Sequence, residues 1–205
     1  MSAPALRHLK AVDPLLATII DRVGPYRLKA RAEGTHFDHV VRAIVGQQLS
    51  GKAAATIFQR VLDLYGGKAP TPAQLLKTPV ATLRGAGLSG RKVEYILELS
   101  ERTRSRSIEI LRIHEMPDDD VMETLVSVRG IGRWTAQMVL MFRLGRPDVL
   151  PELDLGVQKA VQKMHRMRKL PTPRKLQALG AKWAPYRTYA AWYLWRSLEI
   201  PDETT

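Results

Sequence analysis

The chain has 205 residues, of which 45% are hydrophobic, enough for one substantial core or two small subdomains. Thirty-two Lys and Arg against twenty Asp and Glu give a formal charge of +12, and the basic residues are spread along the chain. A folded chain with this balance is most simply a binder of polyanions. The absence of cysteine excludes disulfides, cysteine-ligated zinc, iron–sulfur clusters and a thiol nucleophile.

The sequence contains no evident targeting or membrane segment. Its first residues, Met-Ser-Ala-Pro-Ala-Leu-Arg-His, lack the apolar run of a signal peptide. No apolar stretch has the length needed to span a bilayer. We therefore expect a cytoplasmic protein that does not associate with membranes.

The first third of the chain predicts three amphipathic helices, over about residues 13–23, 35–45 and 53–65. Asp13 is expected to cap the first helix, with Pro14 in its first turn and Gly24 at its end. Between the second and third helices the segment Gly46–Lys52 is polar, and we expect it to form a loop.

The middle third predicts shorter helices joined by basic turns. Thr71-Pro72 and Thr78-Pro79 indicate two helix starts, because proline suits the first turn of a helix. Ser89 is expected to cap a helix that continues to Leu99. The segment Arg102–Arg106 is expected to be a charged link.

A glycine turn, Gly130-Ile131-Gly132, separates two predicted helices. The first begins at the acidic run Asp118–Asp120, where carboxylates suit the helix dipole, and the second begins at the glycines. Glycine here suits a positive φ or a close approach of the backbone to a ligand. The apolar face of the second helix is expected to comprise Ile131, Trp134, Thr135, Met138, Val139 and Phe142. Its unpaired N–H groups would bind an anion, most simply phosphate, although an ordinary helix–helix turn is the alternative.

The last third predicts a helix over Leu155–Met164, a basic stretch over His165–Lys169 and a final helix over Pro185–Leu198. The final helix carries most of the aromatic residues, Tyr186, Tyr189, Trp192, Tyr193 and Trp195. Their spacing spreads them around the helix, which favours a core role over a platform for stacked bases. Because no segment alternates like a strand, we predict an all-α fold, a compact bundle of short helices.

Asp154 lies among apolar residues at the start of the helix predicted from Leu155. It can be read as a simple N-cap, the ordinary role of aspartate at such a position. Alternatively, the anion-binding turn lies 20 residues upstream, and a buried carboxylate near a phosphate-binding surface is costly unless it has a function. On that interpretation Asp154 would stabilise a cationic transition state.

Two further features have competing interpretations. The segment Gln47–Ser50 is either a polar loop with Ser50 as a helix cap or a loop that enters a nucleic-acid groove. Of the five histidines, only His36 and His39 have the spacing of metal ligands, and no third ligand is near them in the sequence. We therefore expect no transition metal.

Five segments, in this order, resemble the helix-hairpin-helix DNA glycosylases and, within them, the 3-methyladenine DNA glycosylase II (alkylpurine) branch. They are Gln47–Ser50, Gly87–Lys92, Gly130–Ala136, Asp154–Gly156 and Trp183–Trp195. The resemblance spans about residues 35–198 and implies one domain over residues 1–205, with its hairpin at about residues 118–143. It also implies two helical subdomains with the active site in the cleft between them, packed N- and C-terminal helices, and no N-terminal β domain.

The resemblance assigns roles to individual residues. Asp154 matches the essential aspartate of the family, and Trp134, Met138 and Trp195 correspond to its base pocket. The residues expected to contact DNA are Gln48, Ser50, Lys52, Arg91, Lys92, Gly130, Gly132, Arg133, Thr135 and Arg187. Gln48 matches the residue that fills the gap left by an extruded nucleotide. A structural Na⁺ or K⁺ would bind the main-chain carbonyls of Val126, Val128 and Ile131, and no other cofactor is required.

Trp134 occupies the position at which the lyase-active relatives carry a nucleophilic lysine. An indole cannot form a Schiff base with the sugar, so the resemblance implies hydrolysis without lyase activity. After base flipping, Asp154 would stabilise the oxocarbenium-like deoxyribose and orient water. Purines alkylated at N3 or N7, such as 3-methyladenine and 7-methylguanine, are already cationic, so they depart without a general acid.

Two departures from the family pattern keep other functions open. Arg129 stands where relatives usually have proline, and would contact a phosphate or remain solvated. Met138 stands where better-known relatives have a pocket tyrosine. The alternatives are a glycosylase for etheno, deaminated or oxidised bases, and a non-catalytic module that binds damaged DNA. In each case we expect a monomer that binds double-stranded DNA with damaged bases, associated with the nucleoid if the source is bacterial.

Overall fold

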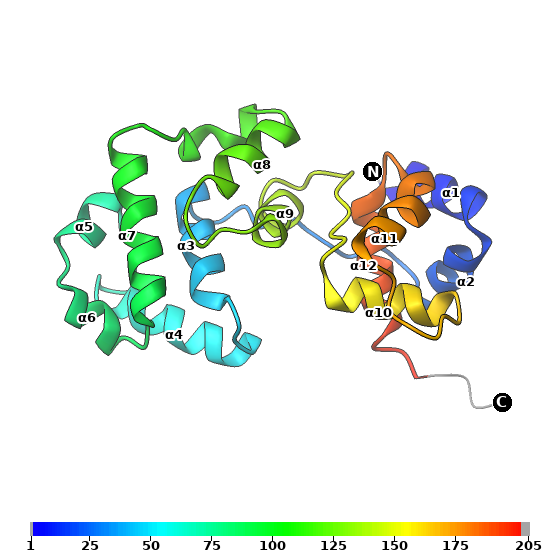
Figure 1. Cartoon of the computed structure of the whole chain (residues 1–205), viewed down its shortest axis with the longest axis horizontal. Helices are drawn as coiled ribbons and strands as arrows, with labels where there is room; N and C mark the ends of the chain where they lie inside the picture. Colours follow the sequence, from blue (N-terminus) through cyan, green and yellow to red (C-terminus); the bar gives the residue numbers. More distant parts are fainter. Residues whose placement is uncertain (1, 202–205) are drawn as a thin grey trace. The chain divides into compact units, whose positions relative to one another are not determined.

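The computed structural model describes residues 2–201 (Figure 1). Across these residues the chain forms helices and turns without a β-strand, which confirms the predicted all-α class. The two ends of the expected domain, residues 1 and 205, lie outside the described residues. No helix in the described range combines the length and the apolar character that a membrane span requires.

The helices form two compact units. The central unit comprises residues 31–139, and the terminal unit comprises the residues up to 30 and from 140 onward. The central unit contains α3 (His36–Gly46), α4 (Gly51–Asp63), α5 (Pro72–Lys77), α6 (Val80–Gly85), α7 (Gly90–Arg104), the 3-10 helix η1 (Ile110–Glu115) and α8 (Asp118–Val126). The terminal unit contains α1 (Ser2–Val12), α2 (Pro14–Val23), α10 (Leu155–Met164), α11 (Pro173–Gly180), the 3-10 helix η2 (Ala181–Trp183) and α12 (Arg187–Ser197). Helix α9 (Arg133–Phe142) begins in the central unit and ends in the terminal unit.

The terminal unit is organised around α12, whose middle residues, Ala190–Leu194, are buried. Helix α12 contacts α1, α2 and α10, so helices from the two ends of the chain lie together (blue and red in Figure 1). Tyr193 adds a hydrogen bond from its hydroxyl to the carbonyl of Gly24 at 2.9 Å. The predicted core role of the α12 aromatic residues is confirmed for Trp192 and Tyr193, which are buried.

Asp13 caps α2 as predicted, and it does so from a buried position. Its carboxylate accepts hydrogen bonds from the indole N–H of Trp183 at 2.8 Å and from the backbone N–H of Leu16 at 3.3 Å. The ammonium of Lys182 lies 3.0 Å away. Burial alone would raise the pKa of Asp13, but these donors outweigh burial and hold the pKa below its ordinary value. Asp13 is therefore an ionised structural cap.

The central unit packs around α7, which contacts α3, α5 and α6, while α3 contacts α4 and η1. Its interior is filled by buried apolar side chains, including Phe37, Ile44, Leu75, Leu83, Ile96, Leu99 and Ile110. Side-chain caps fix several helix starts. The hydroxyls of Ser50 and Ser89 accept from backbone N–H groups of α4 and α7, which confirms both predicted caps. Helix α8 begins at Asp118, as the acidic run predicts.

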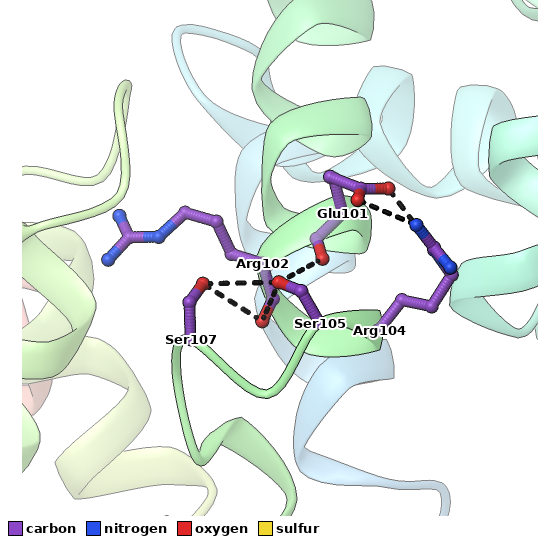
Figure 2. Close-up of polar contacts among 5 residues, drawn as sticks. All are labelled: Glu101, Arg102, Arg104, Ser105 and Ser107. Carbon is purple, nitrogen blue, oxygen red and sulfur yellow. Dashed lines mark hydrogen bonds and ion pairs between the residues drawn. The ribbon is translucent and has the colours of Figure 1, made fainter.

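Helix α7 continues to Arg104, so the predicted charged link over Arg102–Arg106 is wrong for its first three residues. The guanidinium of Arg104 donates to the carboxylate of Glu101 at 2.7 Å (Figure 2). Basic residues in the last turn of a helix, as in α7, also interact favourably with the negative end of the helix dipole. Ser105 then donates from its hydroxyl to the carbonyl of Glu101 at 2.8 Å, where the helix ends.

Other boundaries differ from the sequence prediction. Helices α1, η1 and α11 form where the sequence pattern predicts no helix. Helix α11 begins with Thr172 as its cap and Pro173 in its first turn, a position that proline tolerates because its missing N–H would have no partner there. The predicted polar loop Gly46–Lys52 is shorter, Gln47–Ser50, because α3 extends through Gly46 and Ser50 starts α4.

The two glycines of the turn between α8 and α9 differ in backbone conformation and in the space around them. Gly130 has φ +83°, and a β-carbon added there would lie 2.1 Å from Cδ2 of Tyr95 on α7. Gly132 has neither a positive φ nor any atom within 4 Å of such a β-carbon. The predicted positive φ is therefore confirmed for Gly130 and is absent at Gly132, where a close approach of the backbone to a ligand stays a prediction. At Gly130 the close approach is to a side chain of the protein itself.

We predict that Gly130→Ala lowers the free energy of unfolding by about 2–4 kcal/mol, because it combines left-handed backbone strain with a clash against Tyr95. Gly132→Ala is the matched control and should change stability by no more than about 0.5 kcal/mol. Urea unfolding of both variants and the wild type gives the comparison. Equal stabilities of the two variants would contradict this account of the turn.

Candidate functional site

The start of α9 is exposed, as the sequence predicts. Gly132, Arg133 and Trp134 are all exposed, and the Trp134 side chain is 41% accessible. Ile131, Thr135 and Val139 are buried, so Trp134 does not belong to the buried face on which the helical spacing places it. Trp134 is one position before Thr135 and therefore projects from a different side of the helix.

The loop Gln47–Ser50 is bonded to the turn before α9. The side-chain amide of Gln47 donates to the carbonyl of Gly130 at 2.8 Å and lies 3.4 Å from the hydroxyl of Thr135. The next residue, Gln48, is exposed and has φ +58°, a left-handed conformation uncommon for a residue with a side chain. Gln47 thus ties the loop to the turn before α9. The next residue, Gln48, lies at the surface with a strained backbone and an exposed side chain.

Lys92, which is expected to contact DNA, is bonded to this loop. Its ammonium group donates to the carbonyls of Val45 and Gln47 at 2.7 and 2.9 Å. Burial lowers the pKa of Lys92 below its ordinary value. The last carbonyls of a helix have no hydrogen-bond partner within the helix. Lys92 supplies a donor for one such carbonyl at the end of α3 and for the carbonyl of Gln47, the first residue of the loop. Arg91, Lys52 and Arg133 are exposed.

Helix α7 also binds the turn between α8 and α9. The carboxylate of Glu98 accepts from the guanidinium of Arg129 at 2.8 Å and from its backbone N–H at 3.3 Å. Burial would raise the pKa of Glu98, but the hydrogen bonds and charge of Arg129 hold it below its ordinary value. One turn along, Arg102 donates to the carbonyl of Ser127 at 2.6 Å. Arg129 is therefore part of an ion pair that fixes the turn.

The proposed ion-binding carbonyls lie in the same turn. The carbonyl of Val128 accepts from the N–H of Ile131 at 3.0 Å, which leaves its second lone pair for another partner. With Val126 and Ile131 it makes a set of neutral main-chain oxygens, a donor type that suits Na⁺ or K⁺. Among the described residues no cluster of three histidine, cysteine or acidic side chains has the arrangement of a metal site. The binding of a monovalent cation by these carbonyls stays a prediction.

Asp154 caps α10 with the same oxygen that accepts from Trp195. Oδ1 accepts from the backbone N–H of Val157 at 2.9 Å and from the indole N–H of Trp195 at 2.8 Å. The expectation that Asp154 is buried is wrong: it is half-buried, and its neighbours Leu153 and Leu155 are exposed. The N-cap interpretation is thus correct, and the carboxylate also remains partly accessible from solvent.

Gly156 makes room for this arrangement. A β-carbon at Gly156 would lie 3.0 Å from Oδ1 of Asp154 and 3.0 Å from Cδ1 of Trp195. The indole also stacks on Phe142, whose ring is nearly parallel at a centroid distance of 5.7 Å. The segment Asp154-Leu155-Gly156 therefore combines an acceptor, a helix start and a small residue that admits the tryptophan.

The N-terminal end of α12 holds the chain that leads to Asp154. Arg187 donates to both carboxylate oxygens of Asp148 at 2.7 and 2.8 Å. Burial would raise the pKa of Asp148, but the hydrogen bonds and charge of Arg187 hold it below its ordinary value. The hydroxyl of Thr188 donates to the carbonyl of Arg146 at 2.7 Å and accepts from the N–H of Val149 at 3.0 Å. Arg187, a predicted DNA contact, thus has an intramolecular partner.

The predicted site residues divide between the two units. Asp154 and Trp195 lie in the terminal unit and are bonded to each other. Those in the central unit are Gln48, Ser50, Lys52, Arg91, Lys92, Val126, Val128, Gly130, Ile131, Gly132, Arg133, Trp134, Thr135 and Met138. Sequence reasoning missed the roles of Gln47 and Glu98. Gln47 is inside the segment already singled out, whereas Glu98 gives no sequence signal beyond being an acid on a helix.

Comparison with known proteins places these residues in context. Residues 41–186 match the sequence profile of a protein family, the HhH-GPD superfamily of base excision DNA repair proteins. DNA-3-methyladenine glycosylase 1 of Schizosaccharomyces pombe is 34% identical over 200 residues, which cover 96% of this chain and 88% of that protein. The alkylbase DNA glycosidase-like protein mag2 of the same yeast is 31% identical, with 94% and 92% covered.

Solved structures extend the likeness to the fold. The Schizosaccharomyces pombe 3-methyladenine DNA glycosylase Mag1, in complex with abasic DNA, aligns with a TM-score of 0.89 and 33% identity, covering 99% of this chain and 100% of that chain. A DNA-3-methyladenine glycosidase from Bacillus halodurans aligns with a TM-score of 0.84 and 37% identity, covering 95% and 89%. The helix-hairpin-helix fold expected from the five motifs is therefore confirmed.

We predict that Gln47→Ala frees the loop without unfolding the protein. The variant loses the bonds to Gly130 and Thr135, so backbone amides of Gln48, Leu49 and Gly130 should exchange with deuterium at least about fivefold faster, with a loss in stability of about 1–2 kcal/mol. Gln59→Ala is the matched control, because the Gln59 amide bonds only within α4, to Asp63. Unchanged exchange at these amides in Gln47→Ala would show that Gln47 does not hold the loop.

Proposed function

Because the chain belongs to the HhH-GPD superfamily of base excision DNA repair proteins, we propose that it hydrolyses the N-glycosidic bond of alkylated purines in DNA. The substrates are bases of the 3-methyladenine and 7-methylguanine type. The relatives named 3-methyladenine glycosylase or alkylbase glycosidase, at more than 30% identity over nearly the whole chain, support this substrate class. The observation that carries the proposal is the half-exposed carboxylate of Asp154, which two donors hold at one oxygen.

The reaction needs a stabilised cation on the sugar. The enzyme flips the damaged nucleotide out of the duplex, and the glycosidic bond breaks with oxocarbenium character on the deoxyribose. The carboxylate of Asp154 stabilises this charge and orients the attacking water. Val157 and Trp195 both donate to Oδ1, which fixes the carboxylate in one orientation before the substrate arrives. Because an alkylated purine is already cationic, it leaves without a general acid.

Hydrolysis without strand cleavage follows from Trp134. A lyase step needs an amine that forms a Schiff base with the sugar, and the indole of Trp134 has no such nucleophile. Its exposed position at the start of α9 suits contact with a flipped base. Met138 and Trp195 are the other residues that the resemblance assigns to the base pocket. The product is an abasic site in an intact strand.

The central unit supplies contacts to double-stranded DNA. Gln48 fills the space of the flipped nucleotide, and its exposed, left-handed backbone position supports that role. The N-terminus of α9, with Gly132 and Arg133, binds a phosphate, assisted by Lys52 and Arg91. Lys92 and Arg129 act indirectly, by holding the loop and the turn.

The same proposal includes a bound cation, an oligomeric state and a location in the cell. The carbonyls of Val126, Val128 and Ile131 would hold Na⁺ or K⁺ and support the turn, and the reaction requires no other cofactor. The protein acts as a monomer on damaged duplex DNA. It acts in the cytoplasm, at the nucleoid if the source is bacterial, because its substrate is chromosomal DNA.

The purified protein should release 3-methyladenine or 7-methylguanine from methylated duplex DNA. The remaining strand should stay intact until alkali cleaves it at the abasic site. Chromatography of the released bases and denaturing gels of the strand measure the two products. If base is released only from duplexes with etheno, deaminated or oxidised bases, the proposed substrate class is wrong. Binding without any base release would indicate a non-catalytic module.

Asp154→Asn should bind DNA as the wild type does but release base about 10²–10³-fold more slowly in single turnover, because the stabilising charge is lost. Asparagine remains a good N-cap, so thermal stability should change little. Asp13→Asn provides the matched control: it removes the charge from another capping aspartate bonded to a tryptophan, so it should lower stability while folded protein keeps its rate. Full activity of Asp154→Asn would move the chemistry to another residue.

A further inference from the structure

The excess positive charge of the chain lies mainly in the terminal unit. The central unit, which carries the hairpin, has 15 Lys and Arg against 12 Asp and Glu. The terminal unit has 17 Lys and Arg against eight Asp and Glu. The expected phosphate-binding turn therefore does not account for the strongly basic character of the protein.

One continuous stretch accounts for this imbalance. Residues 155–198 contain ten Lys and Arg and no Asp or Glu. Lys182 pairs with Asp13, Arg187 with Asp148 and Arg196 with Glu199. Seven further cations of this stretch have exposed side chains, and they are Lys159, Lys163, Arg166, Arg168, Lys169, Arg174 and Lys175. We refer to these seven residues as the basic face.

The basic face is part of the folded structure. Lys159 and Lys163 are four residues apart on α10, and residues at this spacing are neighbours on a helix surface. The connection from α10 to α11 is bonded to the helix end, since Met167 donates from its N–H to the carbonyl of Gln162 at 2.9 Å. Pro171, in the same connection, is buried. The cations are thus presented from a fixed backbone, unlike those of a flexible basic tail.

Helix stability does not explain all of these charges. Lys163, in the last turn of α10, interacts favourably with the helix dipole. Arg174 and Lys175, in the first turn of α11, lie at the positive end of that helix, where cations are unfavourable. Lys159 and Lys163, as like charges four residues apart on α10, also repel each other. Local rules of stability are broken in this way most often where a surface has a function.

We propose that the basic face binds the phosphate backbone of duplex DNA, as a contact surface additional to the hairpin. The inference rests on the proposed function, because DNA is the polyanion on which the enzyme then acts. Phosphate contacts of this kind carry no sequence information, so they add affinity for undamaged and damaged duplex alike. They would keep the enzyme on DNA while it searches for rare lesions.

The test neutralises four cations of the basic face in one variant, Lys159→Gln, Lys163→Gln, Arg168→Gln and Lys169→Gln. Glutamine has good helix propensity and similar length, so the fold should persist, which thermal unfolding checks. Binding to undamaged duplex is measured at several salt concentrations. The slope of log K against log salt concentration should fall by about 3–4, and affinity near physiological salt by at least about tenfold.

The matched control changes the same charge on the central unit: Arg60→Gln, Lys68→Gln, Lys77→Gln and Arg84→Gln, all exposed and outside the proposed site. It should keep most of the salt slope of the wild type. Equal slopes for the wild type and the basic-face variant, or an equal loss in the control, would overturn the proposal. The proposal would also be overturned if the basic-face variant bound duplex DNA normally but lost binding to vesicles of anionic phospholipid.

Base release from methylated duplex separates this inference from the proposed function. At saturating enzyme concentration the basic-face variant should release base at the wild-type single-turnover rate. A wild type that shows the expected salt slope but releases no base would contradict the proposed function alone. A basic-face variant with a slower saturating rate and unchanged affinity would overturn the inference, because the face would then act on the chemical step.

Discussion

Two hydrogen bonds that meet at Oδ1 of Asp154 hold the predicted catalytic carboxylate in place. One comes from the backbone N–H of Val157 and starts α10; the other comes from the indole of Trp195 and joins α10 to α12. Asp13 has the same pair of donor types but is buried beside Lys182. The chain therefore contains the same capping device twice, once enclosed for stability and once partly open, where its charge can serve a reaction.

In each unit one helix holds segments that contain predicted site residues. In the terminal unit α12 holds Asp148 with Arg187 near its start and Asp154 with Trp195 near its end. In the central unit α7 binds the loop after α3 through Lys92, and the turn before α9 through Glu98. Two predicted DNA contacts, Lys92 and Arg187, thereby have intramolecular roles. The proposed DNA contacts are therefore made by exposed cations of both units, and the larger net positive charge belongs to the terminal unit.

Local sequence rules predict much of the fold. Asp13, Ser50 and Ser89 cap the helices they are expected to cap, and α10 has the predicted bounds, because caps and apolar periodicity act within a few residues. The contacts that shape the site are not local. The partners of Trp195 and Gln47 are 41 and 83 residues away in sequence. Residue type and spacing do not specify such pairs, so the sequence predicts Asp154 as a cap and misses its bond to Trp195.

A double-mutant cycle on Asp154 and Trp195 tests this account most directly. Single-turnover rates of base release from methylated duplex would be compared for the wild type, Trp195→Phe, Asp154→Asn and the double variant. Phenylalanine keeps an aromatic surface and removes the indole donor. If Trp195 acts by orienting Asp154, then Trp195→Phe slows the wild type and has no further effect on Asp154→Asn. The same fold-loss in both backgrounds would contradict the account, because the two residues would then act independently.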